Sequence, residues 1–158
     1  MKRIIFLFLL VFVGFVGLSQ PKTFYAKGNK ILYLSPVYSG SSTAHTIGAN
    51  LGMGYMVFDK AEVSAGILLA GGYQKIIGLQ TGVRYYLFNS RFNIYPEIKT
   101  GFWSVLSPTK YTNYFASVGG GIGIFSIFDR VGLGISLGYD FVNKTVVPDL
   151  NLRVRIGK

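Results

Sequence analysis

The single histidine, His45, is the first residue to consider for chemistry, because hydroxyl side chains surround it at positions 41–43 and at Thr46. A histidine activates a hydroxyl nucleophile when a carboxylate orients the imidazole ring. The first acidic residue of the chain is Asp59, so an orienting carboxylate would have to come from another part of the fold. A lone histidine without a defined partner does not indicate an active site. We therefore expect His45 to be a solvated loop residue and the protein not to be an enzyme.

The composition gives little support to a metal site or a cofactor. The chain has no cysteine and one histidine, which excludes a thiolate zinc site and a cluster of several histidines. The glycine-rich run at 119–123 lacks the Lys-Ser or Lys-Thr ending of a phosphate-binding loop, and no helical pattern follows it. We expect no metal and no cofactor.

Apolar residues alternate with small or polar residues from Thr46 onward. Ile47, Leu51 and Met53, for example, fall on odd positions, and the even positions between them hold Gly or Asn. Segments of about ten residues repeat this pattern between polar turns, which is typical of membrane-spanning strands. Successive side chains of a strand point to opposite faces, so each segment has one apolar face. With a less regular strand near residues 29–39, the pattern predicts an all-β fold, an eight-stranded antiparallel up-and-down transmembrane β-barrel.

Charged residues inside these segments all fall on the face opposite the apolar one, which indicates that they point into the barrel lumen. Short turns near Tyr73 and at 89–91 set the expected register, in which Glu62 lies opposite Arg84 and Arg84 lies opposite Glu97. The interior of an eight-stranded barrel is just wide enough to be filled by side chains. We therefore expect a plugged lumen rather than a wide pore. The predicted polar network of the lumen comprises Glu62, Arg84, Glu97, Lys99, Asp140, Arg153 and Arg155.

The first residues have the features of a secretory signal. Cations at positions 2 and 3 precede an apolar stretch at 4–16, and the small residues Gly17 and Ser19 precede Gln20. The alternative, a retained membrane anchor, would need about 20 apolar residues. We expect a signal peptide at 1–19 and a barrel domain at 20–158.

Sixteen Lys and Arg against six Asp and Glu give a formal charge of +10, yet the mean hydropathy is +0.41. This hydropathy argues against a nucleic-acid partner, whose basic residues normally cover a polar surface. Cations near turns would instead form a solvated rim or contact outer-membrane lipids and lipopolysaccharide. Turns such as Asp59-Lys60 are shorter than the other connections, and short turns belong on the periplasmic side. We expect a monomer in the bacterial outer membrane with both termini periplasmic.

Several motifs combine glycine, aromatic and turn residues: Lys27-Gly28-Asn29, residues 52–60, Gly82-Val83-Arg84-Tyr85-Tyr86, residues 119–123 and Gly138-Tyr139. Together they resemble one known family, the small outer-membrane β-barrels of the OmpA/OmpX-like superfamily. The resemblance implies insertion by the barrel assembly machinery. Such barrels commonly end in an aromatic residue that this machinery recognises, whereas this sequence ends Ile156-Gly157-Lys158.

Three functions are compatible with this sequence. The first is a non-enzymatic outer-membrane barrel with a structural or surface-interaction role in the envelope. The second is an envelope-lipid-modifying barrel enzyme, because barrels of this size include enzymes that modify lipid A. The third is a soluble periplasmic ligand-binding barrel, since alternating strands also build soluble barrels.

Overall fold

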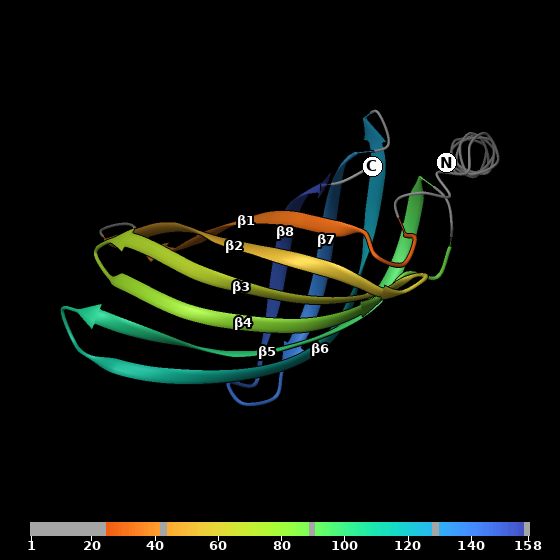
Figure 1. Cartoon of the computed structure of the whole chain (residues 1–158). Helices are drawn as coiled ribbons and strands as arrows, with labels where there is room; N and C mark the ends of the chain where they lie inside the picture. Colours follow the sequence, from red (N-terminus) through yellow and green to blue (C-terminus); the bar gives the residue numbers. More distant parts are fainter. Residues whose placement is uncertain (1–24, 42–43, 89–90, 128–129, 157–158) are drawn as a thin grey trace, which may run out of the picture.

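The computed structural model describes residues 25–41, 44–88, 91–127 and 130–156. The predicted signal peptide at 1–19 lies outside the described residues. Eight strands follow one another around a closed barrel, and each pairs antiparallel with its sequence neighbours (Figure 1). The predicted eight-stranded up-and-down barrel is confirmed. The strands are β1 (Lys30–Ser41), β2 (Ala44–Phe58), β3 (Ala61–Gly72), β4 (Lys75–Tyr85), β5 (Phe92–Ser107), β6 (Tyr111–Ile127), β7 (Val131–Asp140) and β8 (Thr145–Ile156). Within these ranges, no helix is long and apolar enough to cross a membrane.

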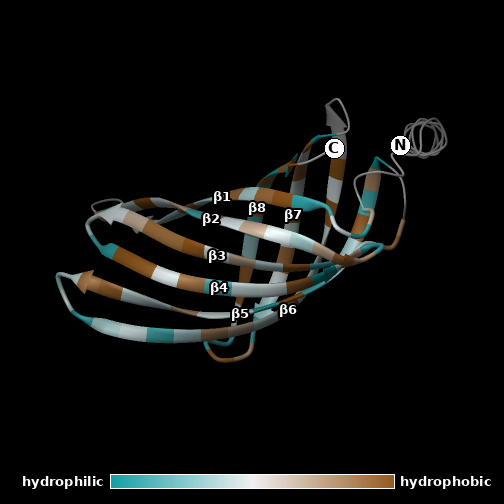
Figure 2. Cartoon of the chain, viewed as in Figure 1, coloured by the Kyte–Doolittle hydropathy of each residue, from teal (hydrophilic) through white to brown (hydrophobic). Residues whose placement is uncertain are grey.

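The predicted alternation reappears as alternating exposure along the strands. In β7, Leu133, Ile135 and Leu137 are all more than half exposed, whereas Gly134 and Ser136 between them are buried. Figure 2 shows the same succession of apolar and polar segments along the strands. An apolar exterior around a polar interior inverts the pattern of a soluble protein and suits a barrel surrounded by lipid.

The connections at the two ends of the barrel are similarly short, which corrects one expectation. At the end opposite the termini, the connecting residues are 42–43, 73–74, 108–110 and 141–144. At the terminal end they are 59–60, 86–91 and 128–130. The ladders extend far toward the end opposite the termini, because β1 and β2 pair as far as Ser41 with Ala44, and β5 and β6 as far as Val105 with Tyr111. The expectation of longer connections opposite the termini is therefore wrong.

Glycines in the barrel wall make room for tyrosines from other strands. A Cβ atom on Gly52 of β2 would lie 2.3 Å from the Tyr33 ring, and one on Gly121 of β6 would lie 2.7 Å from the Tyr95 ring. Both distances are far below van der Waals contact. The glycines therefore permit large side chains inside a narrow barrel.

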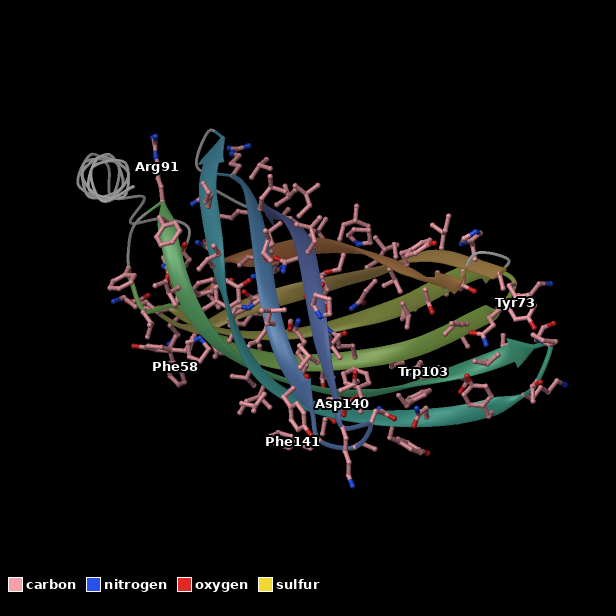
Figure 3. All side chains as sticks on the ribbon, turned by 180° about the vertical axis from the view of Figure 1, so that it is seen from behind. Phe58, Tyr73, Arg91, Trp103, Asp140 and Phe141 are labelled. Carbon is pink, nitrogen blue, oxygen red and sulfur yellow. The ribbon has the colours of Figure 1, made fainter. Side chains whose placement is uncertain are left out.

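The ladder that closes the barrel is short. β1 pairs with β2 from Lys30 to Ser41, but it pairs with β8 only from Lys30 to Leu34, opposite Ile156 to Leu152. Beyond these residues β1 and β8 run in different directions, which Figures 1 and 3 show from opposite sides. We call the unpaired stretch, residues 35–41 of β1 and 145–151 of β8, the open seam.

Candidate functional site

Arg84 and Glu97 form a buried ion pair between β4 and β5. The strand register sets them directly opposite each other, and it also sets Glu62 opposite Arg84, the arrangement expected from the short turns. The Nε and Nη2 atoms of Arg84 lie 3.1 and 2.5 Å from the same Glu97 carboxylate oxygen. The guanidinium also lies 4.3 Å from the centre of the Tyr95 ring, a cation–π arrangement. Both charged side chains are less than a tenth exposed.

A second buried pair crosses the lumen. Arg153 of β8 donates from Nη1 to Oε2 of Glu62 in β3 at 2.6 Å. The Tyr86 hydroxyl donates to the same oxygen at 2.6 Å, and Arg153 donates to the Tyr86 oxygen and to Oδ1 of Asn151. The expected sharing of Arg84 between two carboxylates is therefore replaced by two pairs. Arg84 turns toward Tyr95 and Glu97, and Arg153 reaches Glu62 from the far wall.

Lys99 extends the network toward the centre of the barrel. Its Nζ lies 2.9 Å from Oε1 of Glu97 and 2.7 Å from Oδ2 of Asp149. Asp149 was absent from the predicted network, although it lies in β8 with Asn151 and Arg153 at the same spacing of two. The alternation in β8 therefore indicates that Asp149, like Arg153, faces the lumen.

Two predicted members of the network lie elsewhere. Asp140, at the end of β7, accepts hydrogen bonds from the backbone N–H groups of Val142 and Asn143 at 2.9 and 3.3 Å. It therefore caps the turn between β7 and β8, because this carboxylate comes at the strand end, where turn N–H groups lack ladder partners; Figure 3 shows it there, beside Phe141. Arg155 is buried near the terminal end, and among the described residues its Nε and Nη1 atoms find no protein acceptor.

Aromatic side chains fill the terminal half of the lumen beside this network. The rings of Tyr25 and Tyr86 lie 4.5 Å apart and those of Tyr86 and Tyr95 lie 5.6 Å apart, with Ile31 and Met56 in the same buried cluster. Tyr25 precedes β1, so the chain enters the barrel before its first strand begins. Burial raises the pKa of the Tyr25 phenol, which keeps the ring neutral in this apolar position.

The other half of the lumen is hollow. A cavity of about 380 Å³ extends between Asn50, Gln80, Lys99 and Trp103, and it borders residues of the open seam. Ion pairs and aromatic rings thus occupy one half of the lumen, and a cavity of the size of a small ligand site occupies the other half.

His45 is a strand residue and not the loop residue we expected. It lies in β2, because the hairpin between β1 and β2 closes immediately before it. Its Nδ1 lies 2.8 Å from the Tyr38 hydroxyl, and the two rings stack with centres 5.9 Å apart. The histidine is thus engaged by a phenol rather than by a carboxylate. In the parts of the chain that the structure describes, no three His, Asp or Glu side chains gather as metal ligands.

Solved structures are similar to this chain in fold. The N-terminal β-barrel domain of Pseudomonas aeruginosa OprF superposes with a TM-score of 0.58 at 12% identity, over 83% of this chain and 98% of that one. A de novo designed transmembrane β-barrel gives 0.52 at 15% identity, over 82% and 97%. Neisserial surface protein A gives 0.50 at 15% identity, over 81% and 95%.

The fold is that of a small outer-membrane β-barrel. The eight-stranded barrel fold that the OmpA/OmpX-like resemblance implied is confirmed. No protein-family model matches the sequence, and no curated protein matches it. At 12 to 15% identity, the likeness to the solved barrels concerns the fold alone.

Proposed function

We propose that this protein is a non-enzymatic, plugged β-barrel of the bacterial outer membrane with a structural or surface-interaction role in the envelope. The apolar exterior and the likeness to solved outer-membrane barrels support the location. The single observation that carries the plug is the pair of ion bridges, Arg84 to Glu97 and Arg153 to Glu62, packed against tyrosines across the terminal half of the lumen.

The plug closes the barrel to hydrated solutes. Glu62 and Arg153 lie on β3 and β8, so their contact crosses the interior rather than following one wall. Separating such a pair leaves a buried charge uncompensated, at a cost of about 3 to 5 kcal/mol. Opening a solute path through this half would require breaking contacts of that strength.

The surroundings of His45 support a non-enzymatic role. A catalytic imidazole needs a nucleophile on one nitrogen and an acidic group that orients the ring. Here Nδ1 meets the Tyr38 hydroxyl, and the stacked, exposed pair lies at the rim of the barrel. This arrangement suits a surface contact better than proton transfer.

The charged residues at the two ends of the barrel suggest which molecules the protein contacts. Cations at the terminal end include Lys27, Lys60, Arg91 and Arg130, and those at the other end include Lys75, Lys110 and Lys144. Anionic headgroups, including lipopolysaccharide on one side, are suitable partners for such rims. The proposal includes insertion by the barrel assembly machinery as a monomer, with both termini periplasmic.

Two measurements test the proposal. Membrane fractionation should recover the protein in the outer membrane after a high-pH wash, and recovery in the periplasm would contradict the location. Planar-bilayer recording of the purified protein should show no stable conductance, because the plug spans the terminal half of the lumen. Stable channels that pass hydrated sugars would contradict the plug.

A further inference from the structure

The open seam leaves strand backbone unpaired, which is unusual in a membrane. Its residues, 35–41 in β1 and 145–151 in β8, lie outside the closing ladder. Unpaired backbone is costly in hydrocarbon and is tolerated only where it lines protein or a water-filled cavity. Ser35, Val37 and Asp149 of the seam strands border the 380 Å³ cavity. The unpaired backbone can thus be solvated from inside the barrel.

A proline on each seam strand prevents the ladder from continuing. Continuing the β1–β8 register would place Pro36 opposite Leu150 and Pro148 opposite Tyr38. Proline has no N–H to donate, so strands tolerate it only where an edge is free. Both prolines are paired on their other side, with Ala49 of β2 and Leu137 of β7. The sequence itself therefore keeps the seam open.

Apolar residues line the cavity beside the open seam. Val146 and Val147 on the seam strand β8 are 62 and 44% exposed. Val147 shares the spacing of Asp149 and Asn151, which places it on the interior face of the strand, and it lines the cavity. Leu68 and Phe115 continue the apolar lining on other strands. A hydrocarbon chain would find apolar contact from the bilayer to the interior.

One wall of the cavity is polar and carries more negative than positive charge. Glu97, Asp140 and Asp149 line it, with Lys99 as the only cation among its described lining residues. Lys99 is already bridged by Glu97 and Asp149. Asp149 keeps about a fifth of its side chain exposed and can accept a further hydrogen bond. This wall suits a hydrogen-bond donor and disfavours an anion.

We infer that the open seam is a lateral entrance from the bilayer, through which the cavity binds a single-chain amphiphile. The chain of the ligand lies in the seam against Val147, and its head donates a hydrogen bond to Asp149 and carries no negative charge. This inference goes beyond the proposed function but rests on the membrane location proposed there.

The only tryptophan of the chain, Trp103, lines the same cavity and reports on it directly. Bromine quenches indole fluorescence at contact distance. In phosphatidylcholine vesicles, 2-bromododecan-1-ol should quench Trp103 saturably with its mole fraction in the membrane, and unbrominated dodecanol should reverse the quenching. Phosphatidylcholine brominated in one acyl chain should leave Trp103 largely unquenched, because two chains and a large head do not fit the cavity.

Seam variants provide matched controls. The double substitution Pro36→Val with Pro148→Val restores two backbone N–H donors and lets the ladder extend. It should weaken binding of the alcohol, measured as the mole fraction that gives half-maximal quenching of Trp103, roughly tenfold. Pro96→Val changes a proline of β5 that lies outside the seam and should leave quenching unchanged. The difference in electrophoretic mobility between unheated and boiled samples verifies that each variant folds. If the double variant does not fold, saturation and reversal in the unsubstituted protein decide the question.

Three results would overturn the inference. The first is quenching of Trp103 that rises linearly with the mole fraction of the brominated alcohol and is not reversed by dodecanol. The second is equal quenching of the folded seam variant and the Pro96→Val control. The third is equal or stronger binding of 2-bromododecanoate, which is ionised at neutral pH and should bind about tenfold more weakly beside the carboxylates.

One further variant separates this inference from the proposed location. Leu79 faces outward and is half exposed. In a Leu79→Trp, Trp103→Phe protein, brominated phosphatidylcholine should quench strongly. If brominated phosphatidylcholine quenches the tryptophan at position 79 but the brominated alcohol does not quench Trp103 in the unsubstituted protein, the lateral site alone is refuted. Absence of quenching at residue 79 would refute the membrane location and the lateral site with it.

Discussion

At the scale of single residues, the interior depends on how each buried charge is compensated. Arg84 is 6% exposed and Glu97 is 5% exposed, and each supplies the other with its closest opposite charge. Burial of an ion pair gives little net stability by itself, but removing Glu97 leaves the buried Arg84 charge without its closest partner, and removing Arg84 leaves Glu97 with Lys99 alone. The two residues should therefore be strongly coupled.

A double-mutant cycle measures this coupling. We expect Arg84→Met and Glu97→Gln each to lower the free energy of unfolding by about 3 to 5 kcal/mol. The double variant should lose much less than the sum, because it leaves no charge stranded. Urea unfolding in lipid vesicles is the measurement, and Lys75→Met, at an exposed strand end, is the control. Additivity within about 0.5 kcal/mol would refute the pairing.

At the scale of the elements, some glycines lie where an added side chain would collide with a neighbouring strand. On Gly52 of β2, an added Cβ would lie 2.3 Å from the Tyr33 ring and 2.4 Å from the backbone oxygen of Ala65 in β3. A backbone atom cannot move aside as easily as the end of a side chain. Gly71, near the end of β3, has no atom within 4 Å of such a Cβ.

These two glycines make a matched pair of substitutions. We expect Gly52→Ala to destabilise the barrel by about 1 to 3 kcal/mol through overpacking. Gly71→Ala should change stability by less than about 0.5 kcal/mol. Urea unfolding in vesicles compares them under one condition. Equal effects of the two substitutions would mean that the wall relaxes around Tyr33 instead of resisting it.

Alternation in the sequence predicted the strands and much of the site, because a spacing of two assigns each side chain to a face. Short turns then predicted the pairing of Glu62, Arg84 and Glu97. The same rule could not predict that Asp140 ends a strand and caps the following turn, since strand ends depend on how far each ladder extends. The contact of Arg153 with Glu62 crosses the lumen, and alternation carries no information about opposite walls.

At the scale of the whole molecule, the barrel has two ends that differ in the termini rather than in the lengths of their connections. Tyr73 marks one end, and Phe58 and Arg91 mark the other, where the described chain begins (Figure 3). The orientation that we propose places the Tyr73 end outside the cell. It therefore needs a test that does not depend on loop length.

The absence of cysteine from the sequence makes such a test clean. We expect Gln74→Cys, in the turn between β3 and β4, to react with a membrane-impermeant maleimide on intact cells. Asp59→Cys, in the turn between β2 and β3, should react only after the outer membrane is permeabilised, because it lies at the opposite end. The reverse labelling pattern would show that the barrel is inserted with its termini outward.

The prolines of the seam also bear on how the barrel is assembled. Seven of the eight ladders join strands that are neighbours in sequence, and the eighth joins the two ends of the described chain. Closing that ladder is the most costly step in chain entropy, so it is expected to come late. Until then the protein is an open sheet whose two free edges could pair with another copy. Pro36 removes one backbone N–H donor from the β1 edge, and Pro148 removes one from the β8 edge. They thereby protect the unfinished sheet from polymerising before its own ends meet.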